Sequence, residues 1–217
     1  NLTKQTANVS SFLTIQEGCD KFCTFCVVPY TRGIEVSRPV EDLLKEARFL
    51  VNKGAKEIIL LGQNVNAYHG LNNNSKEVGL DYLIKSIANI NGLKRIRFTT
   101  SHPLDMNIKI IESFKSVSKL MPMLHLPVQS GSNHVLKLMN RRHTVEDYVE
   151  IIERLRDAVP NIALSSDFIV GFPGESEKDF QKTIELIEKI KFSQSFSFKY
   201  SKRPGTPASS VSIQVEE

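Results

Sequence analysis

The hydrophobic positions along the chain follow two alternating patterns. Short apolar runs typical of buried strands occur at residues 11–16, 57–61, 95–99, 123–126, 162–170 and 192–200. Between them, apolar residues three and four positions apart predict amphipathic helices at 39–53, 81–90, 105–116, 134–139, 144–158 and 176–190. Two of these helices begin with capping pairs, Thr144 with Asp147 and Ser176 with Asp179. The pattern therefore repeats a strand and helix about six times.

This alternation predicts an α/β fold in which helices cover a parallel sheet. Right-handed crossovers would wind the strands in chain order. Six units rather than eight favour a partial (β/α)6 TIM-like barrel, and a doubly wound sheet is the alternative fold. We expect a core domain at residues 11–207, a linker at 1–10 and the start of a second linker at 208–217.

Composition narrows the class of protein. The chain has 217 residues, 41% hydrophobic and 24% charged, which suits one packed domain and does not indicate disorder. No apolar run approaches the roughly 18 residues that a membrane helix needs. The net charge of +4 permits an anionic partner such as RNA without requiring one. We see no signal peptide and expect a cytoplasmic protein.

The candidate chemistry begins with the three cysteines, Cys19, Cys23 and Cys26, which have the spacing C-x3-C-x2-C. Three thiolates can hold three corners of a [4Fe-4S] cluster and leave the fourth iron open. The open iron suggests S-adenosylmethionine, which can chelate iron through its amino and carboxylate groups. A structural zinc site is an alternative, although the chain offers one compact loop rather than two ligand pairs. Three cysteines cannot pair off completely as disulfides.

Polar and small residues follow each predicted strand. In parallel α/β folds the functional site lies at the carboxyl ends of the strands, so these segments should converge around the cysteine loop. Beside the cysteines, the candidate cofactor-binding residues are Phe25, Gln63, Asn64, Ser101, His102, Gln129, Ser130, Ser166, Asp167 and Phe172.

Several of these residues have a structural interpretation as well. Gln63 and Asn64 could meet the amino end of S-adenosylmethionine or simply form a turn. Gln129 and Ser130 could bind a ribose or carboxylate, or belong to a helix cap. Asp167 would be costly to bury without a partner, which favours a site role for it and for the neighbouring Ser166.

The aromatic and histidine candidates are also open to two interpretations. Phe172, in a Gly-Phe-Pro-Gly-Glu turn, could stack on adenine or only turn the chain, and Phe25 could shield the cluster or lie near the adenine. His102 could donate a hydrogen bond near a substrate or hold a tight turn.

Four arginines are candidate phosphate contacts. Arg32 and Arg38 flank Gly33 after the cysteine loop, and Arg141 and Arg142 follow the predicted helix at 134–139. Each could bind an RNA phosphate or be an ordinary solvated charge.

Taken together, the motifs resemble the radical S-adenosylmethionine methylthiotransferase family, in particular the central domain of its tRNA-modifying members. The cysteine motif carries the resemblance together with Leu61-Gly-Gln-Asn-Val-Asn and the segments 28–33, 37–39, 98–103, 124–132, 139–144, 166–175 and 203–206. The match runs from about Ser11 to Pro207. The resemblance implies that Cys19, Cys23 and Cys26 carry the cluster on which catalysis depends.

The resemblance also implies a reaction. The reduced cluster would cleave S-adenosylmethionine to methionine and a 5′-deoxyadenosyl radical. That radical would take hydrogen from carbon 2 of N6-isopentenyladenosine beside the tRNA anticodon, where a methylthio group is then installed. The implied partners are that tRNA and an electron donor such as flavodoxin or ferredoxin, and we expect a monomer.

The family also carries an amino-terminal domain with a second cluster and a carboxy-terminal RNA-binding TRAM domain, and this sequence contains neither. We therefore expect the chain to cleave S-adenosylmethionine but not to complete methylthiolation alone, and to bind tRNA weakly. The alternatives are a sibling enzyme acting on threonylcarbamoyl adenosine or a ribosomal protein, and a non-enzymatic zinc or RNA-binding module.

Overall fold

The computed structural model describes residues 8–215. The parallel strands are β1 (Ser10–Thr14), β4 (Glu57–Leu61), β7 (Arg95–Phe98), β8 (Met123–His125), β9 (Ala163–Val170) and β10 (Gln194–Lys199). The helices are α1 (Val28–Arg32), α2 (Val40–Asn52), α3 (Leu80–Ala88), α4 (Ile108–Ser116), α5 (Asn133–Leu138), α6 (Val145–Ala158) and α7 (Glu177–Ile190). Short antiparallel pairs form between β2 (Gln16–Glu17) and β3 (Val36–Ser37), and between β5 (His69–Leu71) and β6 (Glu77–Gly79).

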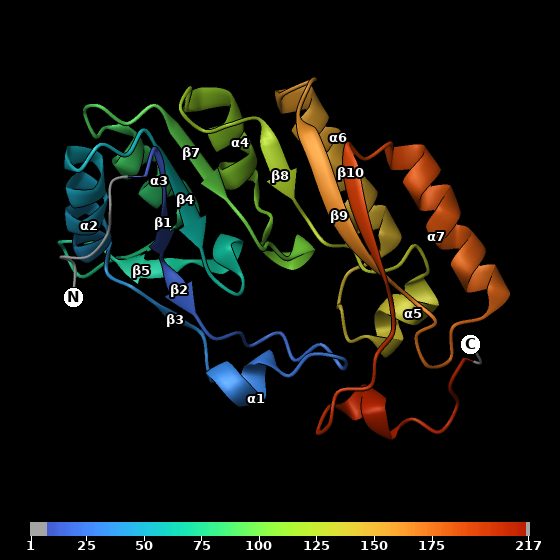
Figure 1. Cartoon of the computed structure of the whole chain (residues 1–217). Coiled ribbons are helices and arrows are strands. Elements are labelled where there is room, and N and C mark those ends of the chain that lie inside the picture. The colour runs from blue at the N-terminus through green and yellow to red at the C-terminus, as the bar shows by residue number, and fades with distance from the viewer. Residues whose placement is uncertain (1–7, 216–217) are drawn as a thin grey trace.

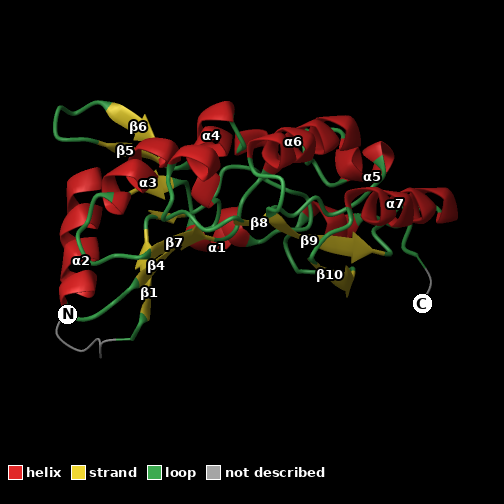
Figure 2. Ribbon diagram, turned by 90° about the horizontal axis from the view of Figure 1, so that it is seen from above, coloured by secondary structure: helices red, strands yellow, loops and turns green. Residues whose placement is uncertain are grey.

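The parallel strands lie side by side in chain order. They form two three-stranded sheets, β1-β4-β7 and β8-β9-β10, and a single parallel bridge from Ile96 to Leu120 marks the junction between them. The larger helices lie along one side of the strands (Figure 2). A doubly wound sheet would reverse its strand order and carry helices on both faces. The structure therefore confirms the partial barrel and not the alternative.

Buried residues explain why the helices pack where they do. In α2 the buried positions are Val40, Leu43, Leu44, Ala47, Leu50 and Val51, which form one face. Strand β4 is buried along nearly its whole length, as expected for a central parallel strand. Both predicted capping boxes are present, at Thr144 with Asp147 and at Ser176 with Asp179. These contacts fix the helices against one main core.

Several boundaries differ from the predicted ones. Helix α4 starts at Ile108 rather than at residue 105, because Pro103–Asp105 form a separate 3-10 turn that ends at Met106. The Asn107 side chain then caps the helix by accepting a hydrogen bond from the Ile110 amide. Strand β10 lies at the edge of its sheet and is exposed along its whole length. The Val9 carbonyl accepts hydrogen bonds from the amides of Lys56 and Glu57, inside the segment predicted as a linker. Residues 1–7 of that segment lie outside the described residues.

The six parallel strands all point towards one end of the molecule, where the cysteine loop and α1 lie (Figure 1). This is the end at which the carboxyl ends of the strands meet. Near the carboxy-terminal end, a 3-10 turn at Pro207–Ser210 returns to the same region, where the Ala208 amide donates to the Thr24 carbonyl at 3.0 Å.

Candidate functional site

The three cysteines lie on the loop between β2 and α1. All three are free thiols; Cys23 is buried, and Cys19 and Cys26 are half-buried. Burial raises the pKa of the Cys19 and Cys26 thiols, and the nearby Cys23 raises both further. Thiols with raised pKa values are protonated at neutral pH, so metal binding here would release protons.

The first side of the cysteine loop is held by residues that follow β1 and β4. The Gly18 amide donates to Gln63 Oε1 at 2.8 Å, and Gln16 Nε2 donates to the Gly18 carbonyl at 3.1 Å. Gln16 Oε1 in turn accepts from the Asn64 amide. Gly18 has a φ of 73°, and a Cβ there would lie 1.9 Å from the Ile34 carbonyl oxygen, so no other residue fits. Gln63 and Asn64 therefore hold the loop in this structure.

The second side of the loop rests on the turn after α5. The Thr24 amide and hydroxyl donate to the carbonyls of Met139 and Leu138, at 3.1 and 2.9 Å. Asn140 Nδ2 donates to the Phe22 carbonyl at 2.9 Å. These contacts join residues more than a hundred positions apart in sequence and fix the middle of the cysteine loop.

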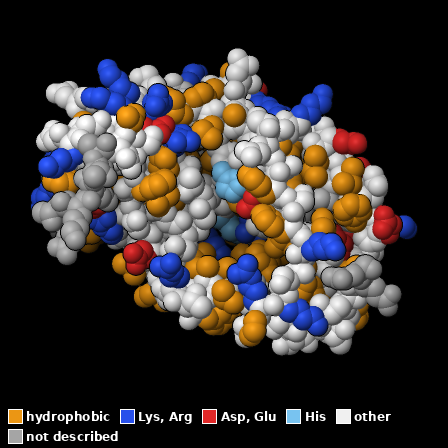
Figure 3. All heavy atoms as spheres, viewed as in Figure 1, with side chains coloured by type: hydrophobic (Ala, Val, Ile, Leu, Met, Phe, Trp, Pro, Cys, Tyr) orange, Lys and Arg blue, Asp and Glu red, His pale blue; other side chains and the backbone are white. Residues whose placement is uncertain are grey.

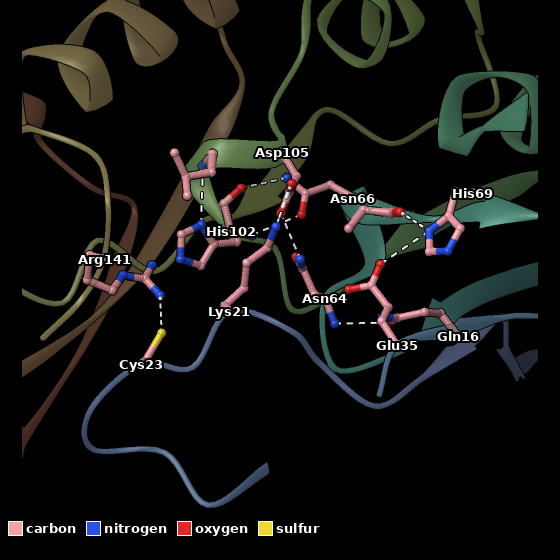
Figure 4. Close-up of polar contacts among 12 residues, drawn as sticks. Gln16, Lys21, Cys23, Glu35, Asn64, Asn66, His69, His102, Asp105 and Arg141 are labelled. Atoms are coloured by element: carbon pink, nitrogen blue, oxygen red, sulfur yellow. Dashed lines mark hydrogen bonds and ion pairs between the residues drawn. The ribbon is translucent and has the colours of Figure 1, made fainter. Parts of the chain in front are cut away.

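A charged network joins the cysteine loop to the ends of β4 and β7 (Figure 4). Lys21 Nζ contacts both carboxylate oxygens of Asp105 at 2.8 Å. Asn64 Nδ2 donates to Asp105 Oδ2 at 2.7 Å. Sequence reasoning assigned Asp105 only to the start of a helix. Its position in the segment after β7 could have indicated it as a site residue.

A cavity of about 370 Å³ opens next to the cysteine loop, at the carboxyl ends of β9 and β10. Four of the residues around it are predicted site residues or a cysteine: Phe25, Cys26, Gln129 and Asp167. The others, which were not among the predicted cofactor-binding residues, are Ile169, Phe198, Lys199, Tyr200, Ser201 and Arg203. The expectation that sites lie at the carboxyl ends of parallel strands could have indicated them, because most of them end or follow β9 or β10. The cavity combines two cations, one carboxylate and apolar walls.

Ser130, Ser166 and Phe172 do not line this cavity. Ser130 Oγ lies 3.4 Å from Thr183 Oγ1, between the loop after β8 and α7. Ser166 Oγ donates to the Leu126 carbonyl and accepts from the Val128 amide, joining β9 to the segment after β8. Phe172 is 2% exposed and packs edge-on against Phe25 and Tyr200, so it supports the cavity wall from behind.

Ser101 and His102 are buried at the end of β7. His102 Nδ1 accepts from the Leu104 amide, and its ring lies 5.8 Å from that of His143. Burial, followed by the charge of Arg141, holds the pKa of His102 far below its ordinary value and lowers that of His143 to about 4. Both rings are therefore neutral at pH 7. Histidine side chains are visible in the hollow on this face of the molecule (Figure 3).

The four predicted RNA contacts occupy different environments. Arg32 and Arg142 are exposed. Arg38 donates to the Thr14 carbonyl and pairs with Glu46 at 2.7 Å, so it joins β1 to α2. Arg141 is 4% exposed and contacts Cys23. Of these four arginines, Arg32 and Arg142 are therefore the most accessible to a partner in solution.

The residues around the cysteines suit a cluster better than a single metal ion. Among residues 8–215, no three His, Cys, Asp or Glu side chains converge closely enough to hold one ion. A four-iron cluster does not require this, because each thiolate binds a different iron. Polar atoms at the same end of the barrel are buried without partners in the described structure: Asn64 Oδ1, Ser101 Oγ, His102 Nε2 and Arg141 Nε. Such atoms are uncommon in folded proteins and suit a polar bound group.

The fold and the site define a partial (β/α) barrel with a three-cysteine loop at the carboxyl ends of its strands. A model of the radical SAM superfamily matches residues 13–187, and the chain belongs to that superfamily. SAM stands for S-adenosylmethionine.

Among curated relatives, the tRNA-2-methylthio-N(6)-dimethylallyladenosine synthase of Zymomonas mobilis is 59% identical over 98% of this chain and 48% of its own length. The synthase of the same name from Rickettsia rickettsii is 59% identical over 96% of this chain and 47% of its own length. The chain thus spans about half the length of the curated relatives it matches.

Solved structures support the fold. The radical S-adenosylmethionine methyltransferase TsrM from Kitasatospora setae has a TM-score of 0.74 and 15% identity, over 92% of this chain and 38% of its own. Coproporphyrinogen III oxidase (HemN) from Escherichia coli has a TM-score of 0.63 and 15% identity, over 96% of this chain and 48% of its own. None of the helices within residues 8–215 is long and apolar enough to cross a membrane.

Proposed function

We propose that this domain is the S-adenosylmethionine-cleaving core of a tRNA methylthiotransferase that acts on N6-isopentenyladenosine in the cytoplasm. The observation that carries the proposal is the three-cysteine loop, fixed at the mouth of the barrel beside a cavity of about 370 Å³. The 59% identity to relatives named for that reaction supports the substrate. The tRNA and a one-electron donor such as flavodoxin or ferredoxin are the proposed partners, and a monomer is the proposed state.

Cys19, Cys23 and Cys26 would hold a [4Fe-4S] cluster. A hydrogen bond from the Val28 amide to Cys26 Sγ at 3.5 Å would also support a thiolate at that position. When bound, the cluster and S-adenosylmethionine supply an electron and a cleavable carbon–sulfur bond, which together give methionine and a carbon-centred radical.

The cavity offers a complementary group for each part of S-adenosylmethionine. Arg203 and Lys199 can pair with its carboxylate, and Asp167 can accept hydrogen bonds from its amino group or ribose hydroxyl groups. Gln129, whose φ of 79° turns the chain at this point, can hydrogen-bond the ribose. Ile169 and Phe25 can cover the adenine. Cys26 borders the same cavity, so the cofactor would lie against the cluster.

The aromatic residues around Phe25 would limit access of water. Phe25 packs on Phe172 with ring centroids 6.4 Å apart, and Phe172 packs on Tyr200 at 5.2 Å. An apolar wall next to a reactive radical protects it from side reactions.

The first experiment is anaerobic reconstitution with iron and sulfide, reduction, addition of S-adenosylmethionine and chromatography for 5′-deoxyadenosine. We expect the product from the wild-type chain and none from Cys23→Ala. Ser116→Ala, which changes a side chain on α4 that bonds only the Glu112 carbonyl, is the handling control and should behave like the wild type. Tight zinc binding without formation of an iron–sulfur cluster would refute the proposal.

A second experiment tests the cavity. Arg203→Gln removes a cation that lines the cavity, and Lys202→Gln removes the neighbouring cation that does not. A charge-assisted hydrogen bond contributes about 1.5–3 kcal/mol, so the affinity for S-adenosylmethionine should fall roughly tenfold to a hundredfold in the first variant only. Equal affinities in the two variants, measured by equilibrium dialysis, would place the cofactor elsewhere.

The tRNA substrate requires the full-length protein. Anticodon stem-loops with isopentenyladenosine, with threonylcarbamoyl adenosine or with unmodified adenosine should be incubated separately and analysed by mass spectrometry. A methylthio group on the isopentenyladenosine RNA alone would support the proposed substrate. A product on either of the other two RNAs instead would refute it.

A further inference from the structure

Arg141 is a buried arginine without a carboxylate partner. Its side chain is 4% exposed and forms no ion pair with any acidic residue in the described part of the chain. One guanidinium nitrogen donates to Cys23 Sγ at 3.6 Å, and the other donates to the Pro127 carbonyl at 2.5 Å. Its Nε has no partner. A buried cation is costly unless negative charge opposes it.

The chain builds this position with unusual backbone geometry. The residues on either side, Asn140 and Arg142, both have left-handed φ values, 57° and 56°. Non-glycine residues in this region cost about 1–3 kcal/mol and persist where the surroundings impose them. Here the surroundings are the cysteine loop itself, which Asn140 contacts at the Phe22 carbonyl. The turn therefore presents the guanidinium of Arg141 to the cysteine loop, where its hydrogen-bond partner is Cys23 Sγ.

The groups facing Arg141 do not supply the missing negative charge. His102 and His143 are neutral at pH 7, and their pKa values are lowered by the same guanidinium. Pro127 offers only a carbonyl dipole. The remaining candidates are the cysteine sulfurs, which carry negative charge when they bind metal. Figure 4 shows the guanidinium directed at the sulfur of Cys23.

We propose that Arg141 is a positioning residue for the iron–sulfur cluster, and that its charge and its hydrogen bond to Cys23 make the cluster easier to reduce. The inference rests on the proposed function, because it requires a cluster on the cysteines. Reduction transfers one electron from an external donor to the cluster and breaks no bond. The added negative charge interacts favourably with a nearby guanidinium, and hydrogen bonds to the sulfurs act in the same direction. Burial strengthens both effects because little water screens them.

The main test is a redox titration of the reconstituted chain, in which the electron paramagnetic resonance signal of the reduced cluster is followed against potential. Arg141→Gln removes the charge, Arg141→Lys keeps it, and Arg142→Gln removes the exposed charge next to it. We expect Arg141→Gln to lower the equilibrium constant for reduction at least tenfold, a fall of about 59 mV for a one-electron couple. Arg141→Lys should change it by less than threefold, and Arg142→Gln should leave it unchanged.

Iron and sulfide content is measured on every sample first. If the wild type takes up neither, the proposed function is wrong and this inference is wrong with it. If the wild type and Arg141→Gln both load fully and have the same midpoint potential, only the role of Arg141 is overturned. A common drop in Arg141→Gln and Arg142→Gln would also overturn it, because the effect would then be that of any nearby charge.

A measurement on the wild type covers the case in which Arg141→Gln does not hold a cluster. The protein is grown with arginine labelled with nitrogen-15 in the guanidinium group, and pulsed electron paramagnetic resonance is recorded on the reduced cluster. We expect a weak nitrogen-15 coupling that disappears in labelled Arg141→Lys and persists in labelled Arg142→Gln. Absence of the coupling in the wild type would refute direct contact between Arg141 and the cluster.

Discussion

The carboxylate of Asp179 joins helix α7 to the loop that carries Gln129, and we predict that Asp179→Asn destabilises the chain. Its Oδ1 accepts from Ser132 Oγ at 2.5 Å, and its Oδ2 accepts from Ser176 Oγ at 2.6 Å and from the Ser176 amide at 3.2 Å. Asparagine keeps only one acceptor oxygen, and that oxygen is neutral. One of the two hydroxyls therefore loses its acceptor, and the other loses a charged one. A hydrogen bond to a charged group contributes about 1.5–3 kcal/mol, and we expect the free energy of unfolding to fall by about 2 kcal/mol.

Asp147→Asn is the matched control. Asp147 occupies the same capping-box position in α6, where it accepts from the Thr144 amide at 2.8 Å, but it is exposed and forms no bond comparable to that with Ser132. We expect this variant to lose less than about 1 kcal/mol. Urea unfolding followed by circular dichroism, with both variants and the wild type in the same cofactor state, measures the difference. Equal losses in the two variants would refute the reasoning.

The contribution of Asp179 should depend on pH. The hydrogen bond from Ser132, followed by that from Ser176, lowers the pKa of Asp179 well below its ordinary value. A lowered carboxyl pKa contributes stability above the unfolded pKa of about 3.9, and that stability is lost as the pH falls towards the folded pKa. The gap between the wild type and Asp179→Asn should therefore be constant from pH 7 to about 5 and shrink below about 4. A gap that stays constant down to pH 3 would contradict this assignment.

Two further predictions concern the same end of the barrel. Gly131→Ala should cost about 1–3 kcal/mol of unfolding free energy in a thermal or urea melt, because the new Cβ would lie 2.4 Å from the Lys182 carbonyl oxygen and 2.6 Å from Thr183 Cα. The control Gly79→Ala places its Cβ 3.0 Å from an Asp81 side-chain oxygen and 4.0 Å from the Tyr68 carbonyl oxygen, and it should cost under about 1 kcal/mol. The ring of His143 should titrate near pH 4 by NMR. The free energy of unfolding should therefore fall as the pH drops from about 6.5 to 4, because the unfolded chain binds the proton before the folded chain does. A titration midpoint near 6.5 would refute the burial of this ring.

The sequence predicted the architecture because periodicity reports which face of an element is buried. All six strands and the helices between them occur close to the predicted positions, and the capping pairs of α6 and α7 form. The placement of the cysteines at the strand ends followed from a rule of parallel folds that does not depend on the particular side chains. The short β5–β6 pair was not predicted, because three-residue strands are too short to show a period.

The detailed contacts around the site could not be predicted, because residue type does not specify a partner. Ser166 has the polarity of a site residue, but its hydroxyl bonds to the Leu126 carbonyl inside the barrel. Arg141 and Arg142 are adjacent and chemically identical, yet one is buried against Cys23 and the other is exposed. The residues on either side of Arg141 are left-handed. Asparagine often adopts that conformation after a helix, but nothing in the arginine at position 142 indicates it.

The contact between Arg141 and Cys23 joins residues 118 positions apart, whereas the three cysteines lie within one short loop. The ligands that would capture iron are therefore available early in folding, since closing a short loop costs little entropy. The group that would adjust the electron affinity of the metal arrives only when α5 and the turn after it have packed against the loop. An immature chain would thus carry a cluster that is harder to reduce, and completion of the barrel would make its reduction easier.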